Sequence, residues 1–337
     1  MELTFRAVCE PVPGEKWRAL FHAHWPAYRK WFLSEGDEAR PSYLAGVRAL
    51  REHMPEIVPV YENLCELAGG GDMAARFLSF YCPPAYLSGC SQAIWQGETP
   101  LLVRNYDYSP RLCDGLILNT RWNGTRVVAQ SDCLWGVLDG INEHGLAVSL
   151  TFGGRRIVGV GFGVPILLRY LLEVCATTAE AAAVLRRVPT HMAYNVTVLD
   201  AAGDFFTAHL SPDREPVIEK TPVATNHQGR VEWSQHARAT ATVERERFLL
   251  HRLTLRNESS DRFVGAFMRP PLYSVAYDRG FGTLYTAVYV PQTGSVEYRW
   301  PGTVWRLSVD TFSERSHVVR FSAENSDTEK HAGPIPQ

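Results

Sequence analysis

The hydrophobic pattern of the chain changes at Pro83-Pro84, and no other sequence feature restricts the possible folds as much. Over residues 15–81, apolar side chains recur at helical spacing. Downstream, short runs typical of β-strands follow one another, and a pair of helical stretches separates an early group of strands from a later one. Strand groups separated by helix pairs favour a layered α+β fold over a doubly wound parallel sheet.

The region upstream of the prolines divides into several predicted helices. Ser42 is a suitable N-cap for a helix whose apolar stripe runs from Leu44 to Met54, and a second stripe stops at the glycines of residues 69–71. Asp72 can cap the helix that follows. An aromatic stripe near the start of the region predicts core packing rather than a cofactor site: Trp17, Phe21, Trp25, Tyr28 and Phe32.

The predicted strands downstream are residues 91–95, 101–105, 116–120, 126–130, 146–152, 194–200, 205–209, 283–290 and 295–299. Asn123-Gly124 and Thr293-Gly294 predict hairpin turns. Helices are predicted over residues 165–175, over residues 177–187 from a capping-box pattern, and over residues 239–253. The alternating charges of residues 244–247 are typical of a solvated helix face. The polar residues 323–337 are expected to be disordered.

The charge and composition of the chain argue against several function classes. The 337 residues carry a formal net charge of -2 and the basic residues are not clustered, so nucleic-acid binding is not expected. The N-terminus lacks the basic and apolar segments of a signal peptide, and the longest apolar run, residues 158–172, is interrupted by Gly, Pro and Arg. We therefore expect a cytoplasmic protein without a membrane partner.

The seven cysteines are odd in number and include no CxxC pair. This pattern argues against a zinc site and against a secreted disulfide framework. The sequence has no HExxH motif, and its glycine-rich residues 159–163 lack the spacing of a phosphate-binding loop. Neither a catalytic metal nor another cofactor is therefore expected.

Gly89-Cys90 stands just before the first predicted strand, and the second strand leads into Arg104 and Asp107. Adjacent strands would place a thiol, a guanidinium and a carboxylate close together. Glycine suits the residue before a bond that the following thiol cuts, because it permits a strained backbone and a close approach. Cleavage would free the α-amino group of Cys90, which can act as general base for its own thiol. A buried strand thiol is the alternative interpretation.

Arg104 and Asp107 are suited to that chemistry. An arginine beside a thiol favours the thiolate and can bind a substrate carboxylate, whereas an aspartate can hold a free ammonium group. In a regular strand the two side chains point to opposite faces, and a bend after Asn105 would be needed to bring them together. A structural ion pair is the alternative interpretation.

Several segments, taken in order, resemble the N-terminal-nucleophile (Ntn) hydrolases of the penicillin acyltransferase type, relatives of the choloylglycine hydrolases and acid ceramidase. The matching segments include GCS at residues 89–91, RNYD at 104–107, GINEHGLAV at 140–148, the glycine-rich entry at 159–165, and ATNH at 224–227. The resemblance implies a four-layer αββα sandwich preceded by a helical leader. It also implies self-cleavage at Gly89-Cys90 and chemistry on amide bonds, by hydrolysis or acyl transfer.

The resemblance extends to individual residues. Cys90 corresponds to the nucleophile, and Arg104 and Asp107 correspond to the pair that surrounds it. Asn226 corresponds to an asparagine that donates to the oxyanion or holds the new α-amino group.

Two further positions are supporting candidates by the same resemblance. Arg245 corresponds to a late arginine at the site, with Arg247 as the alternative register. Where relatives carry an oxyanion asparagine, this chain has Thr151, so the threonine hydroxyl or backbone amides would replace it.

The sequence therefore predicts a self-processing N-terminal cysteine amidase or acyltransferase that forms an acyl-enzyme from a small acyl amide or acyl thioester. Residues 1–89 would form a leader that stays docked as the small subunit of a heterodimer, and residues 90–322 the catalytic core. The uncut chain would be a zymogen, and a homo-oligomer is compatible with the sequence.

Two alternatives remain. In the first, the chain is a non-catalytic binding protein on the same fold, which the departure at Thr151 supports. In the second, the chain stays uncut and Cys90 works with His227 as a Cys-His hydrolase. His144 lies in a glycine-flanked turn and is interpreted as a surface residue.

Overall fold

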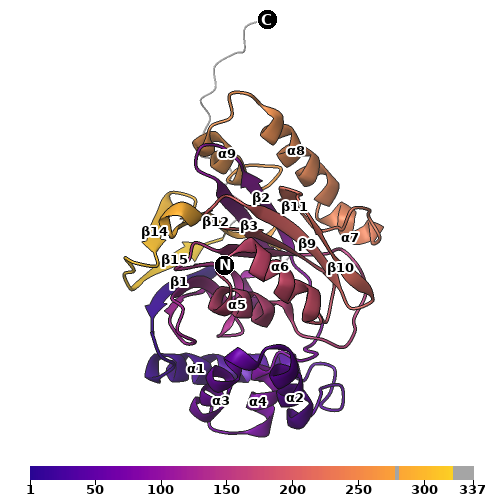
Figure 1. Ribbon diagram of the computed structural model, residues 1–337, viewed down its shortest axis with the longest axis vertical. Coiled ribbons are helices and arrows are strands. Elements are labelled where there is room, and N and C mark those ends of the chain that lie inside the picture. The colour runs from indigo at the N-terminus through magenta and orange to yellow at the C-terminus, as the bar shows by residue number, and fades with distance from the viewer. Residues whose placement is uncertain (278–280, 322–337) are drawn as a thin grey trace, which may run out of the picture.

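The computed structural model describes residues 1–277 and 281–321 of the chain. Within these ranges the strands form two sheets, one of nine strands and one of six. Helices cover the outer face of each sheet, and the leader helices gather at one end of the molecule, at the bottom of Figure 1. The tail predicted to be disordered, residues 323–337, lies outside the described residues.

The nine-stranded sheet has the order β10-β9-β8-β7-β6-β5-β4-β1-β15. Neighbouring strands are antiparallel except β1 and β4, which are parallel. In sheet order the strands are Arg214–Glu219, Phe205–Ser211, Tyr194–Leu199, Ala147–Phe152, Gly136–Asn142, Val127–Asp132, Leu116–Thr120, Glu2–Cys9 and Arg315–Arg320. Every residue of β6, β7 and β8 is buried, because this part of the sheet is covered on both faces.

The six-stranded sheet has the order β11-β2-β3-β12-β13-β14, and all its pairs are antiparallel. In sheet order the strands are Val223–Ala224, Gly89–Trp95, Leu101–Tyr108, Gly282–Val290, Ser295–Trp300 and Thr303–Ser308. The hairpin of β2 and β3 carries the candidate residues Cys90, Arg104 and Asp107, so the predicted adjacency of these two strands is confirmed.

The two sheets pack face to face and have helices outside them. β2 contacts β7 and β8, and β3 contacts β7, so these strands meet inside the sandwich. α5 (Val164–Val174) and α6 (Thr178–Arg187) pack on the nine-stranded sheet, whereas α8 (Thr242–Thr254) and α9 (Ser260–Phe267) pack on the six-stranded sheet. The layers therefore follow the order αββα, and the predicted fold class is confirmed.

The leader contains the predicted helices, namely α1 (Glu15–Phe32), α2 (Tyr43–His53), α3 (Val58–Leu67) and α4 (Asp72–Leu78), with a 3-10 turn at Pro55–Ile57. Ser42 caps α2, as predicted, by accepting a hydrogen bond from the backbone N–H of Ala45. Asp72 is the first residue of α4 rather than its cap, which is Gly71.

The aromatic stripe of α1 is packed in two different ways. Trp17, Phe21 and Phe32 are buried in the core, as predicted. Trp25 and Tyr28 are only partly buried. They still pack against that core, so the predicted core packing of the stripe is confirmed.

The leader also contains a strand, β1, which the helical pattern of its sequence does not predict. It pairs with β4 on one side and with β15 on the other, so it lies inside the nine-stranded sheet. Phe5 is fully buried, and its ring lies 4.8 Å from that of Trp300, measured between centroids. The leader is thus built into the sandwich.

The helix predicted over residues 239–253 corresponds to α8, which begins three residues later, and a separate short helix, α7 (Ser234–Ala239), precedes it. Ala241, between them, has a φ of 47°, which is unfavourable for a residue with a side chain and interrupts the helical path. In the described part of the chain, no helix has both the length and the apolarity needed to cross a membrane.

Candidate active site

Cys90 lies near the start of β2, opposite Tyr106 of β3, and is fully buried. Its thiol faces the interior between the sheets, where Nη2 of Arg104 lies 3.5 Å from Sγ. The hydroxyl of Ser88 lies 3.7 Å from the same sulfur. The uncut chain therefore surrounds the thiol with an arginine and with its own upstream segment.

Arg104 connects the thiol to a buried polar cluster. Its Nη1 donates to the carbonyl oxygen of Leu138 at 3.0 Å and forms an ion pair with Asp139 of β6. Burial acts to lower the pKa of Arg104, but the charge of Asp139 and smaller effects of Tyr285, Cys90 and Tyr106 together outweigh it, so the pKa is raised well above its usual range. Arg104 is thus a permanent cation beside the sulfur, which favours the thiolate.

Asp139 belongs to this site, although the sequence interpretation does not single it out. Besides Arg104, it accepts hydrogen bonds from the hydroxyl of Tyr285, at 2.5 Å, and from that of Tyr289. A carboxylate within the apolar residues 136–142 is a signal that could locate it, because a buried charge needs a partner. The segment matched to the related hydrolases begins one residue later, at Gly140.

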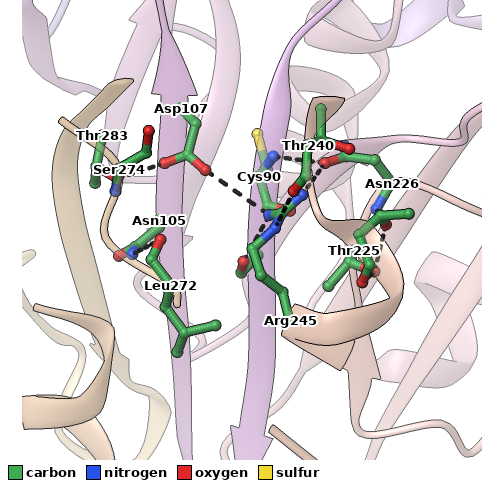
Figure 2. Close-up of polar contacts among 12 residues, drawn as sticks. Cys90, Asn105, Asp107, Thr225, Asn226, Thr240, Arg245, Leu272, Ser274 and Thr283 are labelled. Carbon is green, nitrogen blue, oxygen red and sulfur yellow. Dashed lines mark hydrogen bonds and ion pairs between the residues drawn. The ribbon is translucent and has the colours of Figure 1, made fainter. Parts of the chain in front are cut away.

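Asp107 lies on the other face of β3, toward α8. Its Oδ1 accepts a hydrogen bond from Thr283 at 2.7 Å, and its Oδ2 lies 3.7 Å from Nη1 of Arg245 (Figure 2). Burial raises the pKa of Asp107 to about 6, although Arg245, Thr283 and Arg104 act to lower it. The alternation of a regular strand therefore separates Arg104 from Asp107, and no bend brings the two side chains together.

Arg245, in α8, binds the backbone of the candidate nucleophile. Its Nη1 donates to the carbonyl oxygen of Cys90 at 2.6 Å and to the hydroxyl of Ser91 at 2.8 Å. Burial lowers the pKa of Arg245, while the charge of Asp107 acts to raise it. Arg247 is exposed, so Arg245 is the arginine at the site. The predicted solvated face of residues 244–247 is wrong at Arg245.

Asn226 contacts the residues on both sides of Gly89. Its Oδ1 accepts hydrogen bonds from the backbone N–H of Cys90 at 3.0 Å and from Nη2 of Arg245 at 2.7 Å (Figure 2). Its Nδ2 donates to the carbonyl oxygens of Ser88 and Phe152. This side chain is therefore held in place around the predicted cleavage site.

Glycine is the only residue type that fits at position 89 without rearrangement of the neighbouring side chains. A Cβ atom added there would overlap the ring of Phe281. The close approach expected of the residue before Cys90 is thus present.

Thr151 is hydrogen-bonded away from the thiol. Its hydroxyl donates to the carbonyl oxygen of Thr225 at 2.6 Å and accepts from Nδ2 of Asn195 at 3.0 Å. Among the contacts recorded for residues 1–277 and 281–321, none joins Thr151 to Cys90. Thr151 is thus bonded to the backbone segment that carries Asn226.

His227 is also directed to other groups. Its Nδ1 lies 3.3 Å from the hydroxyl of Thr225 and 3.1 Å from that of Thr242, and its Nε2 lies 3.2 Å from Glu246. Both ring nitrogens are therefore occupied without Cys90. His144 is exposed in the turn between β6 and β7, in agreement with its interpretation as a surface residue.

The described residues contain no group of three or more His, Cys, Asp or Glu side chains arranged to hold a metal ion. The seven cysteines are all free. The side chains that the site brings together are a thiol, two arginines, two carboxylates and an amide.

Comparison with known proteins gives one family match. The family model described as acyl-coenzyme A:6-aminopenicillanic acid acyl-transferase matches residues 95–305, beginning just downstream of Cys90. No curated protein sequence matches the chain.

Similar solved structures include penicillin V acylase from Agrobacterium tumefaciens, at 16% identity over 65% of this chain and 86% of that chain, with a TM-score of 0.45. An ortholog of N-acylethanolamine-hydrolyzing acid amidase from Caenorhabditis elegans is 18% identical over 68% of this chain and 100% of that chain, with a TM-score of 0.46. A mutant of the conjugated bile acid hydrolase from Clostridium perfringens is 11% identical over 68% of this chain and 96% of that chain, with a TM-score of 0.38.

Proposed function

The chain belongs to the acyl-coenzyme A:6-aminopenicillanic acid acyl-transferase family, and we propose that it is a self-processing cysteine amidase or acyltransferase with Cys90 as nucleophile. One observation carries the proposal, namely the two sets of contacts around Cys90. Its thiol lies beside Arg104, while its backbone N–H and C=O are bound by Asn226 and Arg245. A thiol that only filled space in the core would need none of these partners.

In the self-cleavage step, Sγ of Cys90 attacks the carbonyl carbon of Gly89. The C–N bond breaks, its nitrogen takes up a proton and becomes the α-amino group, and Gly89 remains as a thioester on Sγ. Water then hydrolyses the thioester, which releases the Gly89 carboxylate and restores the thiol. Arg104 would stabilise the thiolate, and Asn226 would hold the nitrogen, since its Oδ1 accepts the N–H of Cys90 in the uncut chain.

In the mature enzyme, the same groups would act on an acyl amide. The α-amino group takes the proton of the thiol, the thiolate attacks the substrate carbonyl, and the amine leaves with that proton. The resulting thioester passes its acyl group to water or to another amine. Asn226 would donate to the oxyanion through Nδ2, which becomes free when Ser88 moves away after cleavage.

The uncut chain would be a zymogen, because Cys90 has no exposed surface in it. The leader would remain as the small subunit of a heterodimer. Its strand β1 is paired on both sides, and residues 80 and 82 form backbone hydrogen bonds with residues 163 and 161. The free cysteines support a reducing, cytoplasmic location.

Intact mass and N-terminal sequencing of the purified protein test self-processing. We expect the wild type to give two fragments, produced by cleavage between Gly89 and Cys90, and Cys90→Ala to give a single chain. Cys175→Ala is the matched control, because it removes another buried thiol and should leave cleavage unchanged. A wild-type chain that stays intact on incubation contradicts the proposal. Activity is then measured on N-acyl amino acids, with and without an amine acceptor.

The two alternatives predict different results. For an uncut Cys-His hydrolase, His227→Ala abolishes activity and the chain stays whole, yet the imidazole contacts Glu246 rather than the thiol. For a non-catalytic binding protein, a thiol-reactive probe labels Cys90 no faster than the other cysteines.

A further inference from the structure

A cavity of about 330 Å³ lies between α1 of the leader and the end of β3. This volume is within the range of sites that bind small molecules, about 300–1,000 Å³. Its walls come from α1, from the segment just upstream of Gly89, from β3 with the turn that follows it, and from the end of β5. The mechanism described above uses none of these walls.

Tyr106 connects this cavity to the candidate nucleophile. It lines the cavity and lies opposite Cys90 in the β2–β3 pair, so both side chains are on the inner face of the sheet. The guanidinium of Arg104, which contacts the thiol, lies 4.9 Å from the centroid of the Tyr106 ring. The cavity therefore adjoins the thiol along one face of β3.

The segment upstream of the scissile bond lies beside both the cavity and the thiol of Cys90. Tyr86 lines the cavity, and Ser88, two residues later, has its hydroxyl 3.7 Å from Sγ of Cys90. Cleavage frees this segment at one end, and its movement would open the thiol to the cavity.

Aromatic side chains form part of the cavity walls. Five tyrosine and tryptophan rings contribute, namely Tyr28, Trp31, Tyr86, Tyr106 and Tyr108, and the imidazole of His24 lines the cavity as well. The faces of such rings attract cations as well as apolar groups. Two of the five rings belong to α1, so the leader supplies part of the wall.

Two carboxylates, Asp114 and Asp132, also line the cavity. Asp114 accepts hydrogen bonds from the backbone N–H groups of Leu116 and Leu134 and from the hydroxyl of Tyr28. Asp132 is partly exposed and forms no ion pair with any residue in the described ranges, although Arg111 lines the cavity from its exposed rim. Burial raises the pKa of Asp132 and outweighs the backbone N–H and thiol of Cys133 and the charge of Arg104, which act to lower it. A cationic ligand in the cavity would give this carboxylate an ion-pair partner.

The ionisation of the two carboxylates agrees with this role. Burial raises the pKa of Asp132 to about 6. Burial, with the charge of Asp132, raises the pKa of Asp114 to about 8. At neutral pH, Asp114 is therefore mostly protonated and Asp132 mostly ionised, so the cavity carries one negative charge from this pair.

We propose that this cavity holds the acyl group of the amide substrate and selects acyl groups that end in an ammonium group, with Asp132 as counter-ion and the aromatic rings as walls. The proposal rests on the proposed function and names its substrate class. It also gives α1 a role in the mature enzyme, because the leader would help to determine specificity.

The preference for a terminal ammonium group is tested with two substrates of equal length. They are the 4-nitroanilides of 6-aminohexanoic acid and of heptanoic acid. They differ only in a terminal ammonium in place of a methyl group. For the cut wild-type enzyme we expect kcat/KM to be higher for the ammonium substrate by about tenfold or more, as for a charge-assisted contact. Equal values, or a preference for heptanoyl, overturn the proposal without any variant being needed.

Asp132→Asn tests the assignment of Asp132 as the counter-ion. We expect it to lower kcat/KM for the ammonium substrate much more than for the heptanoyl substrate, so that the preference is lost. Asp261→Asn, on the exposed part of α9, is the matched control and should keep the wild-type preference. Intact mass shows whether each variant has cut itself and has therefore folded. A preference that survives in Asp132→Asn overturns the assignment.

A second measurement separates this proposal from the proposed function. Hexylammonium chloride should slow the alkylation of Cys90 by iodoacetamide in the cut wild type more than heptan-1-ol does, and Asp132→Asn should lose this difference. If neither anilide is hydrolysed but this protection is seen, amide hydrolysis is wrong and the cation site stands. If the anilides are hydrolysed equally and no protection is seen, the cation site is wrong and the hydrolase stands.

Discussion

Arg104 and Asp139 form an ion pair directly behind the thiol of Cys90, and both side chains are fully buried. The pair joins β3 of one sheet to β6 of the other. Asp139 does not contact the thiol itself, so it acts through Arg104 and is a positioning residue. The cation beside the sulfur therefore depends on a carboxylate in the opposite sheet.

Replacing Asp139 by Asn should reduce both stability and thiol reactivity. The variant leaves Arg104 buried without its counter-ion, which typically costs about 3–5 kcal/mol of unfolding free energy. A freer guanidinium also places less positive charge beside the sulfur, so iodoacetamide should alkylate Cys90 more slowly. Tyr289→Phe is the control, because it removes one hydrogen bond to Asp139 and should cost about 1 kcal/mol. An unchanged alkylation rate in Asp139→Asn would show that Asp139 has only a structural role.

Replacing Asn226 by Ala should slow self-cleavage by about 10²-fold, as for a misplaced reacting group, because Oδ1 no longer accepts the N–H of Cys90 and Nδ2 no longer holds the carbonyl oxygen of Ser88. Thr151→Val is the comparison, since its hydroxyl is bonded to Thr225 and Asn195. We expect Thr151→Val to lower the melting temperature and to change the cleavage rate only slightly. The rates are read from intact mass over time. If Thr151→Val slows cleavage as strongly as Asn226→Ala, the threonine is the missing oxyanion donor.

The titration of Asp114 should act to lower the free energy of unfolding as pH rises from about 4 to about 8. Its pKa is raised from 3.8 to about 8 in the folded chain, so over this range the folded state binds more protons than the unfolded state. Each rise in pH then favours unfolding. Asp114→Asn cannot titrate and should flatten the dependence, which urea unfolding at several pH values measures. Asp261→Asn should leave the slope as it is, and a slope unchanged in Asp114→Asn would contradict the assignment.

The two fragments should copurify after cleavage and separate only in denaturant. The reason is that β1 is hydrogen-bonded to β4 and β15, and Phe5 packs in the core against Trp300. Phe5→Ala should lower the unfolding free energy by about 3–5 kcal/mol and make the leader dissociate at lower urea. Leu44→Ala, at a residue that is 70% exposed, is the control and should behave like the wild type. Fragments that separate on simple gel filtration would contradict this prediction.

Much of the fold follows from local patterns. Short apolar or alternating runs with turn residues between them locate strands such as β4 and β8, and the capping box at Thr177 locates the start of α6. β6 is less visible, because its residues are buried on both faces and do not alternate. β1 has the alternation, but its partner β15 is at the other end of the chain.

The candidate site follows from the sequence only in part. Cys90, Asn226 and Arg245 can be matched to a family order, and the structure brings them within hydrogen-bonding distance. The role of Asp139 depends on the packing of β6 against β3, which no local pattern reports. Helical spacing likewise cannot separate Trp17, which enters the core, from Tyr28, which lines the cavity.

The contact between Arg245 and the carbonyl oxygen of Cys90 has a consequence for biosynthesis. The bond proposed to be cut lies early in the chain, but Asn226 and Arg245, which surround it, are synthesised much later. A nascent chain that ends before α8 lacks Arg245 and cannot assemble the site. Cleavage would then be a covalent record of completed folding, and the fraction of cut molecules in a preparation would report how many chains have reached the native state.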